Sequence, residues 1–448
     1  MHQSIKVLLV EPFTRWMDTR FPFRYGIAAM TNLPHLFLRV TVEVGGKRSV
    51  GICSEGLPPK WFTKNPETTF EEDLPDLVEV IRHAAETAVH MPEKESLFAF
   101  WKKLYAVQEV WAMGTNTPPL LANLGVSLLE RGVIDAVCRA VGKPFHEALH
   151  ADDFGVSLGW FHSGLEGKVP ADFLTDTPVS SIGARHTIGL GDALTDADIP
   201  DEDRAEDDLP QALDDCIRAY GLKYFKIKIC GDLEVDQPRL CALADILQRE
   251  CPDFRATLDG NEQFSSMEHF CSHWNELIKD PRLEEMLSAP HLLFVEQPIH
   301  RDHALLTEVP GGSVCIIDES DAELSSLQSA LSAGYRGTSH KNCKGVFKGI
   351  ANACLLEHLR RENPGETYVL SGEDLANCGP VTLLQDLAVM ATLQLGHVER
   401  NGHHYFKGLS VFPEELQRDI VGQHKGLYEM RGNDFAALLI REGQIDLR

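Results

Sequence analysis

The 448-residue sequence predicts an α/β protein whose larger part is a modified (β/α)8 barrel of the TIM type. The chain is long enough for one barrel and a smaller additional domain. Between residues 184 and 398, apolar runs typical of strands alternate with segments of helix length. The glycine-rich loop of an open doubly wound sheet, the alternative architecture, is missing. Gly189-Leu190-Gly191 lacks the third glycine and leads into an acidic stretch.

Residues 1–125 are predicted to form a small α+β domain, because strand patterns come first and helical spacing follows. Two strands and two helices are expected there, at residues 4–10, 35–43, 69–90 and 94–110. Two segments of this domain, Arg20–Gly26 and Gly51–Trp61, are predicted loops.

The barrel domain is expected over residues 126–404, beginning with an amphipathic helix that ends near Gly142-Lys143-Pro144. Its predicted strands lie at residues 184–190, 224–229, 254–259, 292–296, 314–318, 335–341, 367–371 and 392–398. Segments such as 233–250 and 344–362 have the length of the intervening helices.

An acidic segment over residues 192–215 interrupts the barrel pattern after the first strand. It holds eleven Asp and Glu residues against a single arginine, Arg204. Such a charge run predicts a solvated surface insertion, partly disordered. The spacing of its carboxylates is not that of a calcium-binding loop.

Composition excludes several classes of partner. The formal net charge of −25 argues against nucleic acid and against an anionic membrane surface. The eleven cysteines are scattered and include no C-x-x-C pair, which favours a reducing cytoplasm over a disulfide framework or zinc cluster. The apolar run near the N-terminus is broken by Glu11 and Pro12 and is too short for a signal or membrane segment.

Two lysines lie on the second predicted strand. Side chains alternate between the faces of a strand, so Lys226 and Lys228 point into the same space. Adjacent ammonium groups on an apolar strand are costly unless that face is solvated, which is the commoner explanation for an isolated K-x-K pattern. Otherwise a like-charged neighbour lowers the pKa of a lysine toward that of a working base.

Single carboxylates end the next three strands. Asp259, Glu296 and Asp318 each follow an apolar run, at the end of the barrel where active sites lie. A single acid at such a position is usually a helix N-cap, but capping alone explains three successive cases poorly. Three carboxylates can converge on one hard cation, and oxygen-only ligands favour Mg²⁺ over Zn²⁺.

A third lysine, Lys341, follows the sixth strand. Strands two and six are four positions apart in a ring of eight, so Lys228 and Lys341 are expected to face each other across the barrel mouth. This arrangement suits abstraction of a C–H proton next to a substrate carboxylate, with the metal stabilising an enediolate as charge develops.

Five motifs, in this order and at these intervals, resemble the enolase superfamily, specifically the Lys/Lys branch of its mandelate racemase/muconate-lactonizing group. The motifs are Lys226-Ile227-Lys228, Leu258-Asp259-Gly260-Asn261, Val295-Glu296-Gln297-Pro298, Asp318-Glu319-Ser320 and Lys341-Asn342-Cys343-Lys344-Gly345. The resemblance covers most of the chain. It implies that the opening domain is a capping domain whose two predicted loops face the substrate, and that residues 405–448 return to it.

The resemblance also implies a role for each matching residue. Lys228 and Lys341 would be the two acid/base groups, and Lys226 would tune Lys228 and touch the substrate carboxylate. Asp259, Glu296 and Asp318 would bind one Mg²⁺, for which Mn²⁺ is a substitute. Asn261, Glu319 and Lys344 would orient these ligands. Family members are commonly oligomeric, which implies a homo-oligomer.

The expected function is therefore an isomerase or lyase that acts on a small-molecule carboxylate by racemisation, epimerisation or cycloisomerisation. The alternatives are dehydration of an acid sugar and a barrel that binds a carboxylate without turnover. The eighth-strand region lacks the D-x-D typical of dipeptide epimerases, and its His397 and Glu399 are candidate pocket residues. Gly155-Val156-Ser157-Leu158-Gly159 matches a hydrolase nucleophile motif, but its flanks lack the required strand and helix.

Overall fold

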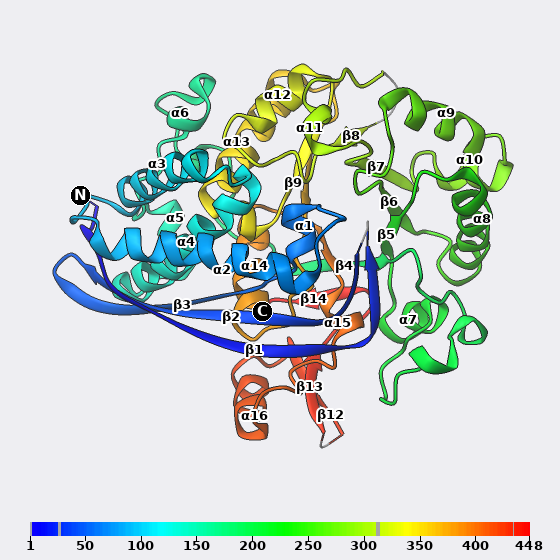
Figure 1. Cartoon of the computed structure of the whole chain (residues 1–448), viewed down its shortest axis with the longest axis horizontal. Coiled ribbons are helices and arrows are strands. Elements are labelled where there is room, and N and C mark those ends of the chain that lie inside the picture. Colours follow the sequence, from blue (N-terminus) through cyan, green and yellow to red (C-terminus); the bar gives the residue numbers. More distant parts are fainter. Residues whose placement is uncertain (1, 26–27, 311–313, 433) are drawn as a thin grey trace.

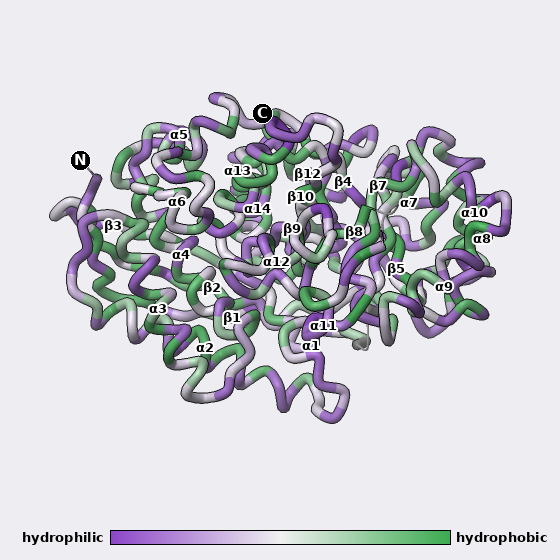
Figure 2. Tube along the Cα trace, turned by 90° about the horizontal axis from the view of Figure 1, so that it is seen from above, coloured by the Kyte–Doolittle hydropathy of each residue, from purple (hydrophilic) through white to green (hydrophobic). Residues whose placement is uncertain are grey.

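The predicted fold class is confirmed: the chain forms a parallel α/β barrel with an N-terminal α+β cap (Figure 1). The computed structural model describes residues 2–25, 28–310, 314–432 and 434–448. Figure 2 shows that helices outside the barrel, such as α8 (Leu233–Glu250) and α9 (Met267–Leu277), alternate between hydrophilic and hydrophobic segments. This alternation is expected of helices that bury one face.

The cap is an antiparallel sheet covered on one face by helices. Its strands, in the order β1-β2-β3, are β1 (Ile5–Tyr25), β2 (Ala28–Val44) and β3 (Lys47–Gly56). Its helices are α1 (Pro59–Thr63), α2 (Phe70–His90), α3 (Leu97–Thr115) and α4 (Pro119–Val141). A capping box between Thr69 and Glu72 begins α2, and Gly142 ends α4 in the left-handed conformation with φ of 70°.

Helix α4 contacts both the cap and the barrel. The predicted boundary between residues 125 and 126 falls inside this helix, which packs against β2, β3, α2 and α3. On the barrel side, its Glu130 accepts hydrogen bonds from the backbone N–H groups of Val346 and Phe347 at the start of α13 (Val346–Glu362).

The first predicted loop, Arg20–Gly26, is largely strand. Strand β1 continues to Tyr25, and Phe23 pairs with Met30 of β2. Pairing is interrupted between Asp18 and Phe23, where Pro22 has no N–H to donate. Gly26 lies outside the described residues. The segment therefore forms the end of a long hairpin instead of an irregular loop.

Within the described residues, the barrel has eight parallel strands in the order β8-β7-β6-β5-β4-β11-β10-β9. They are β4 (Ser181–Ile188), β5 (Tyr224–Lys228), β6 (Arg255–Asp259), β7 (Leu292–Glu296), β8 (Cys315–Ile316), β9 (Gly337–His340), β10 (Val369–Gly372) and β11 (His397–Arg400). A bridge between Ile317 and Thr338 closes the ring, and Ser339 N donates to Ile317 O at 2.9 Å.

Helices connect these strands and flank the barrel. The remaining helices are α5 (Phe145–His150), α6 (Leu158–Phe161), α7 (Leu213–Tyr220), α10 (Pro281–Met286), α11 (Arg301–Ala304), α12 (Ser326–Ser332), α13 (Val346–Glu362), α14 (Val381–Thr392), α15 (Gly402–Tyr405) and α16 (Glu414–Gln423). Short 3₁₀ turns lie at Ser163–Leu165, Pro170–Asp172, Asp196–Asp198, Asp201–Asp203 and Asn342–Lys344. No helix in the described part of the chain is long and apolar enough to cross a membrane.

The C-terminal segment contacts both units. Phe406 forms a bridge with Thr19 of β1, and the ring of Phe412 lies 6.1 Å from that of Phe37 of β2. Strands β12 (Tyr428–Arg431) and β13 (Phe435–Leu438) then pair with each other. The last strand, β14 (Gln444–Asp446), pairs antiparallel with β4 of the barrel.

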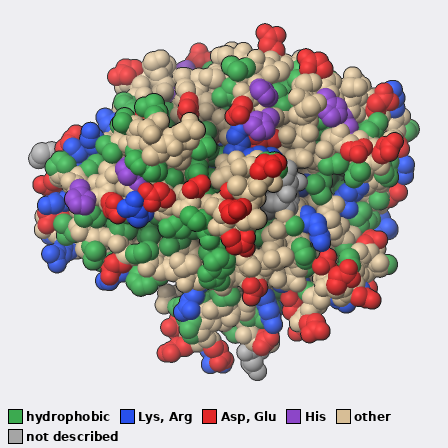
Figure 3. Space-filling model, viewed as in Figure 1, with side chains coloured by type: hydrophobic (Ala, Val, Ile, Leu, Met, Phe, Trp, Pro, Cys, Tyr) green, Lys and Arg blue, Asp and Glu red, His purple; other side chains and the backbone are tan. Residues whose placement is uncertain are grey.

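The acidic segment is more ordered than its composition predicts. Leu194, Ile199 and Leu209 are buried, and Asp207 accepts hydrogen bonds from Arg20 of β1 at 2.7 and 2.8 Å. Asp192 is also buried and accepts from the hydroxyl of Tyr405. Apolar residues spaced between the acids therefore anchor the segment. Figure 3 shows acidic side chains spread over the whole visible face, so the net charge is not confined to this segment.

The contact between β3 and α4 gives a stability test. A Cβ at Gly51 would lie 1.9 Å from the carbonyl oxygen of Gly132 and 2.6 Å from the amide nitrogen of Ala136, both backbone atoms of α4. We expect Gly51→Ala to lower the free energy of unfolding by about 1–3 kcal/mol, because the sheet and the helix must separate. Thermal unfolding of the purified variant measures the change.

The matched control is Gly114→Ala on α3, where nothing lies within 4 Å of the added Cβ. Alanine is the better helix former, so this variant is expected to gain about 1 kcal/mol. Equal midpoints for the two variants would contradict the close packing of β3 on α4.

Candidate active site

The three predicted carboxylates converge at the C-terminal mouth of the barrel. Asp259 and Glu296 are the last residues of β6 and β7, and Asp318 follows β8 by two residues. All three are at most 1% exposed. Adjacent parallel strands in register bring their last side chains together, which explains the convergence: Asp259 of β6 pairs with Glu296 of β7.

The ammonium of Lys226 lies among four carboxylates. Its Nζ is 2.9 Å from Asp259 Oδ2, 2.9 Å from Glu296 Oε2, 2.6 Å from Glu373 Oε2 and 3.1 Å from Glu399 Oε2. Burial alone would lower the pKa of Lys226, but these carboxylates raise it well above the ordinary lysine value. The carboxylate neighbours therefore outweigh both burial and the nearby ammonium groups at Lys226.

Lys228 and Lys341 contact different carboxylates and line one cavity. Lys228 Nζ lies 2.6 Å from Asp259 Oδ2, and Lys341 Nζ lies 2.6 Å from Asp318 Oδ2. Lys228 ends β5 and Lys341 follows β9, and these strands are four positions apart in the ring. The predicted placement of a lysine at each of two opposed strands is thus present in the structure.

Sequence reasoning missed Glu373, which follows β10. Its Oε2 contacts Lys226 at 2.6 Å and Lys341 at 2.9 Å, while Arg185 of β4 and Ser371 donate to its Oε1 at 3.0 and 2.8 Å. Glu373 therefore links Lys226 and Lys341. Its signal in the sequence is the one used for the other acids, a carboxylate directly after an apolar strand.

The acids form an all-oxygen donor set that fits a hard cation such as Mg²⁺. Carboxylate oxygens of Glu296, Asp318 and Glu373 lie within 4.8 Å of one another. Although Glu296 Oε2 lies 2.9 Å from the Lys226 ammonium, it accepts no hydrogen bond. Asp259, the third predicted ligand, lies outside this compact group and is held by Lys226 and Lys228.

The pKa values of the crowded acids are shifted in different directions. Burial and the adjacent Glu373 raise the pKa of Glu296 well above its ordinary value. Burial works to raise the pKa of Glu373 too, but Lys226 and Lys341 hold it well below its ordinary value. Burial likewise opposes ionisation of Asp318, yet Lys341 and Lys344 lower its pKa. A site with such closely packed carboxylates favours an added positive charge.

The residues predicted to orient the ligands lie against them. Asn261 N donates to Asp259 Oδ1 at 2.8 Å, and Lys344 Nζ donates to Asp318 Oδ1 at 3.1 Å. The side-chain amide of Asn261 donates to Glu319 Oε1 at 3.3 Å. Burial and Asp318 raise the pKa of Glu319 to about 7.

Of the two eighth-strand candidates, Glu399 lines the cavity and His397 does not. Glu399 Oε1 accepts from Thr187 at 2.7 Å. His397 begins β11, stacks on Tyr224 at the start of β5 and contacts Arg185 Nη1 at 2.7 Å. Because His397 and Tyr224 both begin their strands, His397 lies at the opposite end of the barrel from the cavity that Lys228 and Lys341 line.

The cap forms part of the wall of the cavity, whose volume is about 40 Å³. Residues of both units line it: Phe23, Met30, Pro58 and Trp61 from the cap, and Lys226, Lys228, Asp259, Asn261, Asp318, Lys341, Asp374, Leu375, Ala376, Glu399 and Asn401 from the barrel. Both segments predicted as substrate-facing loops thus reach the site, but Gly51–Trp61 consists mainly of the end of β3 and the start of α1 instead of a loop.

Ion pairs and backbone contacts fasten α1 of the cap to the barrel. Glu262 contacts Arg301 at 2.7 Å and Lys64 at 3.5 Å, and Arg301 donates to the carbonyl oxygens of Trp61 and Phe62 at 3.1 Å. Asn261, Glu262 and Gln297 have φ of 39°, 66° and 38°, a strained conformation for residues other than glycine. Such strain is often concentrated at functional sites.

The hydrolase alternative has no support in the fold. Ser157 precedes α6 at Leu158–Phe161, and residues 155–157 follow a turn instead of a strand. A nucleophile elbow requires a strand before the serine and a helix after it. The match is therefore a coincidence of sequence.

Solved structures share this fold over nearly the whole chain. The L-Ala-D/L-Glu epimerase from Bacillus subtilis is 12% identical with a TM-score of 0.56, and the alignment covers 98% of this chain and 99% of that chain. A muconate lactonizing enzyme from Pseudomonas fluorescens, complexed with muconolactone, is 14% identical with a TM-score of 0.59 and coverage of 99% and 94%. An enolase from Bradyrhizobium, complexed with magnesium and mandelic acid, is 14% identical with a TM-score of 0.57 and coverage of 100% and 95%.

At these identities the similarity establishes the fold and not the reaction. No family model matches the chain, and no curated protein matches its sequence. The fold is the one that the five motifs predicted.

The buried ammonium of Lys226 gives a stability prediction. We expect Lys226→Met to lower the free energy of unfolding by about 3–5 kcal/mol in the presence of a chelator, because four buried carboxylates lose their common cation. Denaturant unfolding measures the loss.

Lys223→Met is the matched control. The Lys223 side chain is 51% exposed and pairs with the exposed Asp253, so its removal should change stability by no more than about 1 kcal/mol. If both variants were equally stable, Lys226 would not be the cation that holds the acids together.

Proposed function

We propose that this chain is a member of the enolase superfamily, in its mandelate racemase/muconate-lactonizing group. We propose that it is a Mg²⁺-dependent enzyme that removes the proton next to the carboxylate of a small-molecule substrate. One observation carries the proposal: Lys228 and Lys341, on opposed strands, line a single cavity together with buried carboxylates that lie between them in the ring. Two positioned acid/base groups on opposite sides of one carbon can move protons on both of its faces.

In this proposal Asp259, Glu296 and Asp318 hold the metal, and their all-oxygen chemistry suits Mg²⁺ with Mn²⁺ as a substitute. The ion would supply Lewis-acid stabilisation of the negative charge that develops on the substrate carboxylate. Asn261 and Lys344 position Asp259 and Asp318 through the contacts described above.

The lysines carry the protons. In its neutral form one lysine accepts the proton from one face of the α-carbon, and the ammonium of the other returns a proton to the opposite face. Lys228 and Lys341 can each act in either direction, which supports racemisation, epimerisation or cycloisomerisation. Glu373 forms ion pairs with Lys226 and Lys341. Lys226 also lines the cavity, and in this proposal it contacts the substrate carboxylate.

The cap restricts what reaches the lysines. Phe23, Met30, Pro58 and Trp61 present apolar surface to the cavity, and Lys341 Nζ lies 5.0 Å from the ring centroid of Trp61. These residues would exclude water from the reacting carbon, which strengthens the electrostatic interactions at the site.

The cellular setting is part of the proposal. Eleven free thiols suit a reducing compartment, so we place the protein in the cytoplasm. The net charge of −25 disfavours nucleic acid and anionic membranes as partners. A homo-oligomer remains a prediction from the family resemblance.

Hydrogen exchange in D₂O tests the function. The protein is incubated with Mg²⁺ and a panel of carboxylates: dipeptides, mandelate, muconolactone and acid sugars. We expect deuterium to enter the α-carbon of one class without loss of water, and a chelator to stop it. Loss of water would indicate acid-sugar dehydration instead. Saturable binding with no exchange and no product would indicate a barrel that binds without turnover.

Variants of the lysines test the two-base arrangement. Lys228→Ala and Lys341→Ala are each expected to lower turnover of the exchanging substrate by about 10²–10⁴-fold, since each removes a general acid/base. Lys223→Ala, a change of an exposed lysine just before the same strand, is the control. Full activity in both site variants would rule out the two-base model.

A further inference from the structure

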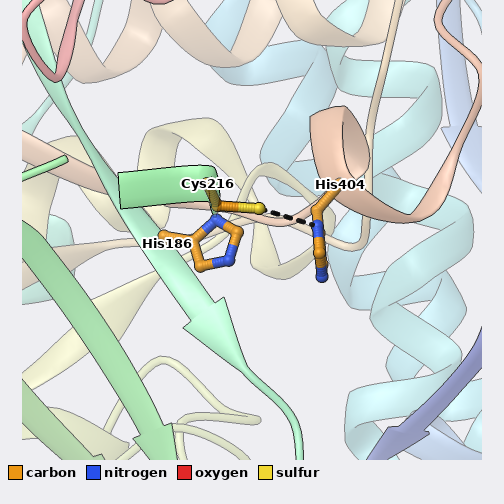
Figure 4. A group of neighbouring side chains, drawn as sticks. All are labelled: His186, Cys216 and His404. Atoms are coloured by element: carbon orange, nitrogen blue, oxygen red, sulfur yellow. Dashed lines mark hydrogen bonds between the residues drawn. The ribbon is translucent and has the colours of Figure 1, made fainter. Parts of the chain in front are cut away.

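A second cluster of ligand-type side chains lies outside the barrel interior. His186 of β4, Cys216 of α7 and His404 of α15 point toward one another (Figure 4). One donor atom from each lies within 4.8 Å of the other two. Cys216 Sγ is 3.7 Å from His404 Nδ1, and the rings of His186 and His404 are 4.7 Å apart. None of the three residues is more than 2% exposed.

Strand geometry separates this cluster from the acids and lysines at the barrel mouth. Arg185 and Thr187 point into the barrel, where they donate to Glu373 and Glu399. His186 lies between them in the sequence and therefore points to the opposite face of β4. There it meets α7 and α15, which pack against the outside of the strand.

We propose that His186, Cys216 and His404 bind one thiophilic metal ion, with Zn²⁺ as the ion that the donor set fits best. Two imidazole nitrogens and one thiolate are ligands that Zn²⁺ prefers and Mg²⁺ does not. Bonds of about 2.3 Å to sulfur and 2.0–2.1 Å to nitrogen place tetrahedral S and N ligand atoms about 3.6 Å apart. The distance of 3.7 Å between Cys216 Sγ and His404 Nδ1 matches this value.

A third histidine, His403, contacts the cluster through His186. His403 Nε2 lies 3.2 Å from His186 Nδ1, and its own Nδ1 is buried without a hydrogen-bond partner. A histidine that binds a metal usually donates its other ring N–H to an acceptor, and His403 Nε2 is placed to accept that bond from His186 Nδ1.

Metal binding at this cluster releases one proton and changes no oxidation state. Zn²⁺ displaces the thiol proton of Cys216 to solvent, and both imidazoles coordinate as neutral ligands, so nothing is oxidised or reduced. Burial raises the pKa of Cys216 and lowers that of His186 to about 3, so all three donors are neutral before binding. Arg20 adds positive potential at Cys216, and Asp192, Asp215 and Asp214 of the acidic segment add negative potential there.

The ion would link three separate parts of the chain, because its ligands come from β4, α7 and α15, and a water molecule would complete the tetrahedral set. Arg20 of the cap hairpin donates to the carbonyl oxygen of His404 at 2.6 Å and to Asp207 of the acidic segment. The ring of Phe21 lies 4.9 Å from that of His404. A metal at the cluster would therefore fasten α15, and through it the hairpin that carries Phe23, to the barrel wall.

Metal content and Co²⁺ spectroscopy test the site. The full-length protein is freed of metal, loaded with Zn²⁺ and desalted into Mg²⁺-containing buffer. We expect one zinc per chain to remain. Co²⁺ in its place should give the intense visible bands of tetrahedral cobalt and a thiolate-to-cobalt band in the near ultraviolet. The proposal would be overturned if the unaltered protein retained no zinc, or if its Co²⁺ form showed nothing but weak octahedral absorption.

Cys216→Ser should lose the near-ultraviolet band and the retained zinc. Cys354→Ser, which changes another fully buried cysteine on α13, should keep both. An unchanged spectrum in Cys216→Ser would also overturn the proposal. These readouts do not depend on turnover or on the carboxylates at the barrel mouth, so failure here is distinct from failure of the proposed function.

Discussion

The interaction on which the site depends is the buried ammonium of Lys226 among the carboxylates of Asp259, Glu296, Glu373 and Glu399. Buried carboxylates this close repel one another and are stable only when a cation is shared among them. The shared cation draws together the C-terminal ends of β5, β6, β7, β10 and β11. The same crowding of acids makes the mouth of the barrel a place that favours a divalent cation.

Much of the barrel and the core of the site could be predicted, because both follow from local periodicity. A strand that ends in a carboxylate at the mouth of a barrel can be recognised in the sequence, as for Asp259, Glu296 and Asp318. Strand counting then places Lys228 and Lys341 on opposed strands without any tertiary information. The search for a carboxylate directly after a strand would also have identified Glu373, which follows β10.

Other features depend on contacts between distant segments and could not be predicted. The acidic segment was expected to be solvated, yet Arg20, 187 residues before Asp207, pairs with it. The apolar face of α4 does not reveal in the sequence which elements it covers. The carboxylate partners of Lys226 could not be predicted as a set, because they come from four other strands.

The most direct test of the account is a crystal structure of the protein soaked in Mn²⁺, with the ion located by its anomalous scattering. The account predicts one ion at the barrel mouth, bound to oxygens of Asp259, Glu296 and Asp318. Because ion and ammonium compete for the same oxygens, Lys226 Nζ should no longer lie within bonding distance of Glu296. A structure with no ion there, and with Lys226 still contacting Glu296 and Glu373, would contradict the account.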